Sequence, residues 1–509
     1  MFKLIILSNH ILSLHVGLWL SLLCRNVHSH SGVSMFGKHF GAEVCDNSDE
    51  SSCNTKRHCW GYENGCTKPQ QWYLKPNCND EQGYRRFETM EDKRNAWWRQ
   101  ADFGFVKNVQ DSLVPICLAK RENDSSFVCS KDITYCHAKH LFLDLRSMQN
   151  SHGWLRDNKL KKGEIGGHCQ YNYLPSPTEN KDAHRMTLSS WISDIENYSS
   201  LPFQPTNDNH CDVIVEKPTY FMKLDAVVNM YHHFCDFFNL YLTLHVNGSF
   251  SKDINIVLWE ENKRRSLGNF GVTWKAFTDN EVLYLGDAFR NKKVCFKDAI
   301  FALLPRMVFG LFYNTPLVPG CFKTGVFKAF NRFLMERLQI TQERNVTNLD
   351  QPIRIGLLSR GTAYRKILNQ NEIEKALGGL VGTRFEVLNY NWKMPFIDQI
   401  KNSHNLDIFI GLHGAGLTHL LFMPDWAAVF EIYNCGDPNC YKDLARLRGL
   451  NYYTWENEDK LVEKTENKHE KYGDNLKFRN FAFNVEEFMR IVTLMVEKVR
   501  LNLRHHEDI

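Results

Sequence analysis

The second half of this chain alternates short apolar runs with helical periodicity, and this pattern constrains the fold more than any other feature of the sequence. Strands that alternate with helices pair in parallel and form an α/β unit of the nucleotide-binding type. Beyond the polar stretch 341–351, strands are predicted at 353–358, 385–388, 406–411, 428–433 and 452–455, helices at 371–377, 396–403, 415–422 and 441–448, and an amphipathic terminal helix at 485–503.

A first α/β half is predicted upstream, from Cys211 onward. Its long helix lies at 224–245, and its strands lie at 213–215, 254–259, 282–285 and 299–303. Two successive α/β halves place a cleft between them. Ligands in such sheets bind beyond the carboxyl ends of the strands, so the loops that follow strands are the first candidates for a site.

Cysteines crowd the N-terminal third of the chain, which has 16 Cys in all. So many cysteines do not suit a reducing cytosol, and no paired C-x2-C spacing indicates zinc, so disulfides are predicted. Removal of Cys24 with a signal peptide would leave an odd number, so at least one thiol should stay unpaired. The N-terminal cysteines are Cys45, Cys53, Cys59, Cys66, Cys78, Cys117, Cys129, Cys136 and Cys169.

The first residues, 1–29, have the pattern of a cleaved signal peptide, and an uncleaved membrane anchor is the alternative. No later segment has the ~18 uninterrupted apolar residues of a membrane helix, so no stable membrane span is expected after signal removal. Four N-glycosylation triplets start at Asn123, Asn197, Asn247 and Asn345. The last four residues, 506–509, loosely resemble ER-retention tetrapeptides, so the ER lumen is the predicted location.

The charges of the chain are balanced. Lys and Arg number 62 against 58 Asp and Glu, for a formal net charge of +4. Binding to a phosphate backbone needs clustered cationic charge, so a nucleic-acid partner is not expected. The predicted organisation is a Cys-rich region at 30–150, a first α/β half at 151–345, a second α/β half at 346–480 and a terminal helix with its tail at 481–509.

The most informative motif is a glycine-punctuated turn after the strand predicted at 406–411. Glycines let a ligand approach the backbone, and the amide groups that open the following helix favour an anion. A tight turn with packing glycines is the alternative, because the spacing matches neither the P-loop nor the dinucleotide fingerprint. The candidate ligand contacts in this turn are His413, Gly414, Ala415, Gly416, Thr418 and His419.

Other candidates follow neighbouring strands of the same half. Arg360 and Arg365 lie beyond the strand predicted at 353–358, where guanidinium groups suit phosphate oxygens. Glu431 ends another strand and could accept ribose hydroxyls. A surface salt bridge is the alternative role for the two arginines.

In the first half, His232 and Asp236 are four residues apart in a helical pattern and therefore lie on one face. Together they could position and deprotonate a hydroxyl, and a structural His–Asp pair is the alternative. Asp279 and Glu281 flank Asn280 in an acidic triplet, which is a weak candidate for a metal site because a surface turn also explains it.

Several runs of the sequence resemble glycosyltransferase family 61. The runs that carry the resemblance are 231–236 (YHHFCD), 303–306 (LLPR), 365–369 (RKILN), 414–419 (GAGLTH) and 430–431 (FE), supported by 59–63 (CWGYE), 100–104 (QADFG), 141–145 (LFLDL) and 421–426 (LFMPDW). The resemblance covers most of the chain.

This resemblance implies an inverting, GT-B-like transferase with two Rossmann-like halves that face a cleft, preceded by the Cys-rich disulfide-bonded region. It implies transfer of N-acetylglucosamine from UDP-GlcNAc to Ser or Thr hydroxyls of folded EGF-like repeats, in proteins such as Notch-like receptors or matrix proteins. Arg360, Arg365, the 413–419 turn and Glu431 would then hold UDP, and Asp236 would act as the base, with His232 orienting or replacing it. A divalent cation such as Mn²⁺ stays open, with Asp279 and Glu281 as its candidate ligands.

Two alternatives use the same motifs. A non-catalytic luminal protein that binds EGF folds would keep the fold without the transfer. A family 61 transferase could also use a different sugar or a different acceptor.

Overall fold

The computed structural model describes residues 76–81, 86–147, 160–172, 188–207, 209–260, 267–306, 318–362, 364–432, 439–464 and 478–505. The predicted signal peptide, the first part of the predicted Cys-rich region (30–75) with Cys45, Cys53, Cys59 and Cys66, and the C-terminal tetrapeptide lie outside these ranges. Within them, no helix combines the length and the apolar character that a membrane crossing requires.

The C-terminal half is a five-stranded sheet in which every neighbouring pair is parallel. Its strands, in the spatial order β15-β14-β16-β17-β18, are Thr383–Leu388, Ile353–Leu358, Ile408–Leu412, Ala428–Ile432 and Asn451–Thr454. Each overlaps a predicted strand, and the three central strands, β14, β16 and β17, are buried on both faces, as is typical of parallel sheets. The α/β prediction is confirmed.

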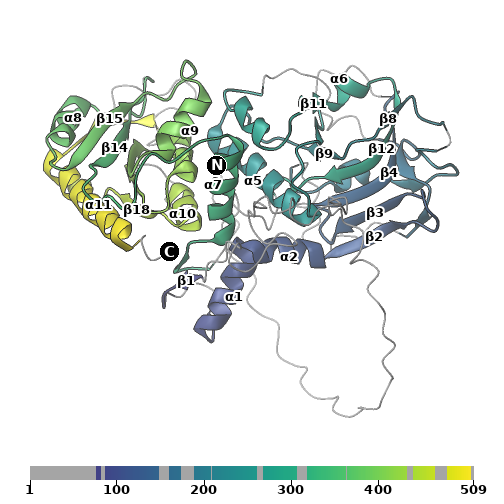
Figure 1. Cartoon of the computed structure of the whole chain (residues 1–509), viewed down its shortest axis with the longest axis horizontal. Coiled ribbons are helices and arrows are strands. Elements are labelled where there is room, and N and C mark those ends of the chain that lie inside the picture. Colours follow the sequence, from purple (N-terminus) through teal and green to yellow (C-terminus); the bar gives the residue numbers. More distant parts are fainter. Residues whose placement is uncertain are drawn as a thin grey trace, which may run out of the picture. The chain divides into compact units, whose positions relative to one another are not determined.

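Helices cover both faces of this sheet (Figure 1). Helices α8 (Gln370–Gly378) and α11 (Val485–His505) pack on the face formed by residues such as Ile355 and Ile410. The opposite face, which includes Phe409 and Val429, packs against α9 (Phe396–His404), η4 (Ala415–Phe422) and α10 (Cys440–Arg448). The element predicted as a helix at 415–422 is a 3₁₀ helix.

The other large sheet has eleven strands and mixes parallel with antiparallel pairs. The order along its path is β11 (Leu283–Tyr284), β10 (Asn255–Leu258), β9 (Thr219–Met222), β12 (Lys293–Phe301), β4 (Cys136–Asp144), β3 (Ser126–Ser130), β2 (Leu113–Leu118) and β6 (Gln170–Tyr171), with β5 (Ile165–Gly167), β7 (Ser199–Ser200) and β8 (Val213–Val215) paired off it.

The pairing of β4 with β12 corrects one predicted boundary. These strands run antiparallel from the pair Asp144 and Lys293 to the pair Cys136 and Phe301. Strands β2, β3 and β4, all before residue 150, therefore belong to the same sheet as the strands of the first α/β half. The sequence prediction missed these strands because it weighed the cysteines of the region and not the long-range partner that β12 supplies.

Smaller elements complete the described chain. They are β1 (Asn77–Cys78), α1 (Met90–Ala101), α2 (Phe103–Asp111), α4 (Ile192–Ile195), η3 (Gly271–Ala276), α6 (Leu285–Phe289), β13 (Cys321–Phe322), α7 (Gly325–Arg337), η5 (Glu458–Lys460), β19 (Leu461–Lys464) and β20 (Asn480–Phe483).

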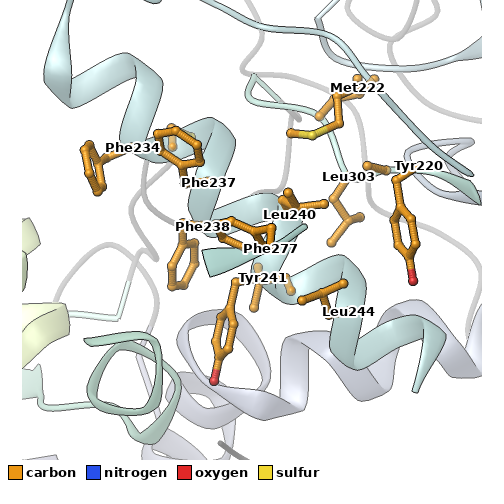
Figure 2. Packing of buried hydrophobic residues seen from close by; sticks show 14 of the residues in the cluster. Tyr220, Met222, Phe234, Phe237, Phe238, Leu240, Tyr241, Leu244, Phe277 and Leu303 are labelled. Carbon is orange, nitrogen blue, oxygen red and sulfur yellow. The ribbon is translucent and has the colours of Figure 1, made fainter. Parts of the chain in front are cut away.

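Helix α5 (Met230–Asn247) forms the central core of the first half and is apolar around most of its circumference (Figure 2). Its aromatic residues Phe234, Phe237, Phe238 and Tyr241 are fully buried. Burial of each such side chain stabilises the fold by roughly 1.5–3 kcal/mol. The helix starts later than predicted because residues 223–229 form the loop that leaves β9, and the Asn229 side chain accepts the amide of Tyr231 as its N-cap.

Four disulfides join described cysteines and confirm the disulfide prediction. They are Cys78–Cys321, Cys117–Cys169, Cys129–Cys136 and Cys211–Cys295. Cys235 and Cys440 are thiols. The Cys78–Cys321 bond links positions 243 residues apart, so it fastens the N-terminal segment to the chain just before α7.

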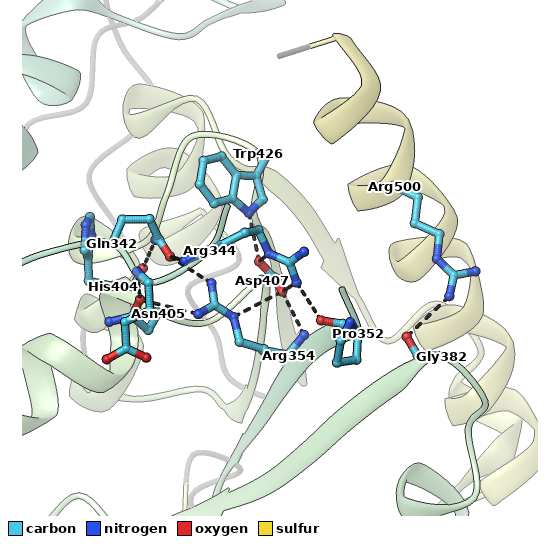
Figure 3. Close-up of polar contacts among 11 residues, drawn as sticks. Gln342, Arg344, Pro352, Arg354, Gly382, His404, Asn405, Asp407, Trp426 and Arg500 are labelled. Atoms are coloured by element: carbon cyan, nitrogen blue, oxygen red, sulfur yellow. Dashed lines mark hydrogen bonds and ion pairs between the residues drawn. The ribbon is translucent and has the colours of Figure 1, made fainter. Parts of the chain in front are cut away.

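A buried carboxylate fixes the amino ends of the C-terminal sheet (Figure 3). Asp407, which is 0% exposed, pairs with Arg344 at 2.5 Å and accepts the indole N–H of Trp426 at 2.8 Å. It also accepts the backbone amide of Arg354 in β14 at 2.8 Å. A buried charge is tolerated when its hydrogen bonds are satisfied, as they are here.

A second buried carboxylate caps two helices at once. Asp102 is the N-cap of α2, and its two oxygens also accept the amides of Gly325 and Val326 at the start of α7. Burial raises the pKa of Asp102 to about 6. The folded protein therefore holds this proton at pH values where the unfolded chain has already lost it.

Stability should therefore depend on pH through Asp102. Its contribution is fully present below about pH 4 and declines by about 3 kcal/mol as the pH rises through about 6, because the raised folded pKa favours proton binding by the native state. Urea unfolding of the wild type and Asp102→Asn, at about pH 4 and about pH 7, measures the difference. The wild type should gain on the variant at the lower pH, and a difference that does not change with pH would contradict this assignment.

Candidate functional site

The strand order of the C-terminal sheet contains a topological switch point. The chain leaves β14 to form β15 on one side and later returns to form β16 on the other side. The loops that leave β14 and β16 at their carboxyl ends therefore diverge, and a crevice at this point is the general ligand site of open α/β sheets. Arg360 follows β14, and His413 and Gly414 follow β16.

The two predicted arginines meet at the turn after β16. Arg360 Nη1 and Arg365 Nη1 donate to the carbonyl oxygen of His413 at 3.2 and 3.3 Å. Arg365 has a φ of 58° and lies over the ring of Phe478 at 5.6 Å. Segments 366–368 and 480–481 are hydrogen-bonded to each other, since Leu368 donates its amide to the carbonyl of Phe481, and this pairing supports the position of Arg365.

The electrostatics of this pair favour an anion. Burial, and then the nearby charge of Arg365, lower the pKa of Arg360 to about 10. Within the described part of the chain, Arg360 forms no ion pair with a carboxylate. A half-buried guanidinium beside a second one, held only by a carbonyl oxygen, is stabilised when an anionic ligand binds.

Gly414 creates the space in which the two arginines lie. Its φ of 155° and ψ of 169° fall in a region that is essentially restricted to glycine. A Cβ at this position would lie 2.5 Å from Arg360 Nη1 and 2.9 Å from Arg365 Nη1. Ala415 and Gly416, which begin η4, are half-exposed beside this turn.

Glu431 lies behind the turn, where it contacts other side chains. Its Oε1 is 2.5 Å from His413 Nδ1, and its Oε2 accepts the hydroxyl of Tyr452 at 2.5 Å. The carboxylate is 1% exposed. This geometry does not favour the predicted contact with ribose, because both oxygens already have partners in the protein. Sequence reasoning missed Tyr452, although its place in the predicted strand after Glu431 was a usable signal.

Thr418 and His419 lie beneath the turn and are buried. Thr418 interacts with Tyr441, and His419 Nδ1 bonds the carbonyl of Gly416 at 2.7 Å. The His419 ring packs against Tyr390 at 4.5 Å, and burial lowers the pKa of His419 to about 4. These two residues support the turn from within.

The first half has its own polar cluster, at the carboxyl ends of two adjacent parallel strands. Asp225 follows β9, and Arg306 lies beyond β12. Asp225 Oδ2 is 2.6 Å from His232 Nδ1, and Arg306 donates to both carboxylate oxygens at 3.0 and 2.8 Å. Burial opposes ionisation, but the hydrogen bonds from His232 and Arg306 prevail and lower the pKa of Asp225.

The predicted pair of His232 with Asp236 does not form. His232 bonds Asp225, while Asp236 bonds His233 Nδ1 at 2.9 Å and accepts the amide of Asp225. Asp236 is 1% exposed, and burial raises its pKa well above the ordinary value. A carboxyl that is this buried and bonded within the protein is not open to an acceptor hydroxyl, so the geometry does not favour the predicted role of base. Sequence reasoning missed Asp225 and Arg306, although both follow strands and 303–306 was among the noted runs.

Aromatic contacts connect the two clusters. Tyr231, next to His232, packs edge-on against Tyr441 with ring centres 5.6 Å apart. Tyr441 in turn packs edge-on against His413 at 5.2 Å. Phe234 of α5 also contacts Phe422 of η4, at 5.2 Å. The helix that carries His232 is therefore in direct contact with the elements that carry His413.

The weaker metal candidates do not fit a cation. Asp279 forms an ion pair with Lys252 at 2.5 Å, and both Asp279 and Glu281 are exposed. They precede β11 and so lie at the amino-terminal edge of the parallel strands, opposite to Asp225. No group of three or more His, Cys, Asp or Glu side chains in the described ranges is arranged to hold a metal ion.

The sequence pattern of the family Glycosyltransferase 61 matches residues 140–430, which include the cluster around Asp225 and the turn at Gly414. The protein is therefore a glycosyltransferase. The chain belongs to glycosyltransferase family 61, as the resemblance predicted.

Relatives extend the match beyond this span. A Canis lupus familiaris protein named "EGF domain-specific O-linked N-acetylglucosamine transferase" is 46% identical over 466 residues, 90% of this chain and 86% of that protein. A Mus musculus protein of the same name is 47% identical, over 90% of this chain and 86% of that protein. A Drosophila melanogaster protein of the same name is 41% identical, over 88% of this chain and 85% of that protein. A solved structure of the heptosyltransferase TibC is 12% identical, and the match covers 58% of this chain and 77% of that protein. Its TM-score of 0.22 is too low to support a structural conclusion.

Substitution of Gly414 tests the geometry of the turn. Gly414→Ala should lower the free energy of unfolding by about 1–3 kcal/mol, because the backbone is strained for any other residue and the Cβ displaces both guanidiniums. Gly361→Ala is the matched control, since a Cβ there meets no atom within 4 Å. Urea unfolding measures both, and equal stabilities of the two variants would refute this account of the turn.

Proposed function

We propose that this glycosyltransferase moves N-acetylglucosamine from UDP-GlcNAc to Ser or Thr hydroxyls of folded EGF-like repeats, with inversion at the anomeric carbon. The names of the relatives support the sugar and the acceptor. The observation that carries the proposal is the pair Arg360 and Arg365 at the switch point of the sheet, where a nucleotide diphosphate would supply the anion that the pair favours.

On the donor side, the diphosphate would bind the two guanidiniums and the amide groups of Ala415 and Gly416. Its negative charge grows as the bond to the sugar breaks, so these groups stabilise the leaving group more in the transition state than in the ground state. Their position is set in advance by the carbonyl of His413, which reduces the reorganisation that the reaction needs.

Glu431 would act through His413 rather than on ribose. Its carboxylate accepts the Nδ1 proton of His413, which fixes the tautomer of that ring. Tyr452 in turn holds the other carboxylate oxygen. In this role Glu431 is a positioning residue for the turn that contacts the nucleotide.

On the acceptor side, His232 is the proposed base. The hydroxyl oxygen of the acceptor attacks the anomeric carbon, the bond from that carbon to the diphosphate oxygen breaks, and the hydroxyl proton passes to His232. Asp225 bonds the other ring nitrogen and stabilises the imidazolium that forms, and Arg306 holds Asp225. The side chain of His232 is 23% exposed, which leaves it open to an acceptor.

The purified chain, incubated with a panel of UDP-sugars and one folded EGF repeat, tests the proposal by mass spectrometry. We expect addition of one N-acetylhexosamine from UDP-GlcNAc, and at least a tenfold loss of UDP affinity in Arg365→Ala by calorimetry. Transfer of another sugar would indicate a different donor. UDP binding without transfer to the repeat would indicate a different acceptor, and repeat binding without UDP binding would indicate a non-catalytic protein.

Variants of the acceptor cluster test the base. His232→Ala should lower kcat by about 100-fold or more, since a positioned base contributes that much. Asp225→Asn should lower kcat by about tenfold or more, because the amide cannot stabilise the imidazolium that forms on His232. Asp236→Asn is the matched control and should stay within tenfold of wild type. A reversed ranking of the His232 and Asp236 variants would restore Asp236 as the base.

The ER lumen is the proposed location, supported by the four disulfides and the signal-like N-terminus. Immunofluorescence of the full chain, together with an ER marker, tests it. A diffuse cytosolic signal would argue against it.

A further inference from the structure

The four N-glycosylation triplets of the sequence differ in how accessible their asparagine side chains are in the folded protein. A glycan is bulky and must point into solvent, so a triplet can be used in the folded protein only where the amide of its asparagine is accessible. The structure describes all four asparagines, Asn123, Asn197, Asn247 and Asn345.

Asn247, the last residue of α5, is half-buried. Its Nδ2 donates to the hydroxyl of Tyr220 at 2.9 Å, and its Oδ1 accepts the hydroxyl of Tyr135 at 3.4 Å. Both tyrosines are buried, at 0% and 2% exposure. A sugar on Nδ2 would enter the space that Tyr220 occupies, so this triplet is closed in the folded state.

Asn197 is closed for a similar reason. Its Nδ2 donates to the carbonyl oxygen of Leu160, a buried residue, at 2.8 Å. The next residue, Tyr198, stacks on Phe127 with ring centres 4.6 Å apart and holds this segment against the first sheet. The amide of Asn197 therefore faces the protein.

Asn345 has the opposite geometry. It is exposed, and its Oδ1 accepts both the amide of Thr347 at 3.1 Å and the hydroxyl of Thr347 at 2.8 Å. This turn engages the carbonyl side of the asparagine with the threonine of its own triplet, and no described residue accepts a hydrogen bond from Nδ2. The preceding residue, Arg344, is anchored on buried Asp407.

The position of Asn345 is compatible with the proposed activity. It precedes β14 and lies near the amino end of β16, where Asp407 is located. Arg360 and His413 follow the opposite, carboxyl ends of the same strands. A glycan on Asn345 would thus stand away from the donor turn.

Asn123 is also open. It lies in the turn between β2 and β3, is exposed and has a φ of 68°. The turn is closed by Asp124, whose Oδ2 accepts the amides of Lys120 and Arg121, and not by Asn123 itself.

We propose that the folded protein carries N-linked glycans on Asn123 and Asn345 and none on Asn197 and Asn247. In each modification, Nδ2 of the asparagine bonds to the anomeric carbon of an oligosaccharide linked to a lipid diphosphate. The bond from that carbon to the phosphate oxygen breaks, its electron pair leaves with the lipid diphosphate, and Nδ2 loses one proton to the base of the cellular oligosaccharyltransferase.

The test uses the full chain expressed in cells with an intact secretory pathway. The soluble, folded fraction is treated with peptide N-glycosidase in heavy-oxygen water, which converts each glycosylated asparagine into a heavy aspartate. Peptide mass spectrometry should find the label at Asn123 and Asn345 and unmodified asparagine at Asn197 and Asn247. Absence of label from either open site, or label at either closed site, overturns the proposal.

Variants give an independent readout by gel mobility. Asn345→Gln and Thr347→Ala should each remove one glycan, while Thr347→Ser should keep it, because the serine hydroxyl preserves the triplet. Asn247→Gln is the matched control and should leave the mobility of the folded protein unchanged. The assignment does not depend on the proposed function: an inactive protein with this glycan pattern would refute the transferase reaction and leave the glycan sites standing.

Discussion

The pairing of β14 with β16, fixed at its amino end by Asp407, is the constraint on which the donor side depends. Asp407 accepts the amide of Arg354 through its side chain and donates its own amide to the carbonyl of Arg354. These bonds set the register of the two strands, in which Ile355 faces Ile408. Because side chains alternate along a strand, this register also determines which residues meet beyond the carboxyl ends of the two strands. There, the turn that contains Gly414 lies next to the loop that contains Arg360.

The two clusters of the site differ in how their charges are compensated. Arg360 and Arg365 bring like charges together at one carbonyl oxygen, that of His413. Asp225 is instead compensated within the protein, because His232 and Arg306 both bond it. The first arrangement is suited to hold a charged ligand, and the second to keep one imidazole oriented. Tyr231 and Tyr441 pack between them, so the two clusters are joined by direct ring contacts.

Much of this fold could be predicted from sequence, and the reason is local. Strand β16 is a continuous apolar run, and β14 and β17 carry one charged residue each. The carboxyl ends of parallel strands lie at one edge of the sheet, where Arg360 contacts the carbonyl of His413. The choice of partners could not be predicted in the same way. Helical spacing put His232 and Asp236 on one face, but the tertiary fold brought Asp225 to His232 from another segment. Glu431 likewise bonds Tyr452 of the neighbouring strand β18, a contact that depends on the order of the strands and not on the residues around Glu431 alone.

The N-terminal segment is tied by covalent and polar bonds to the chain at the start of α7, and this has a practical consequence. Cys78 is bonded to Cys321, and Asp102 caps the helix that starts at Gly325. The span that matches the family, 140–430, lacks Cys78 and Asp102. It also lacks the edge strand β18 of the C-terminal sheet and helix α11, which packs on that sheet. A recombinant version trimmed to that span would expose the core of both halves, so expression designs should keep the segment from Cys78 and the terminal helix.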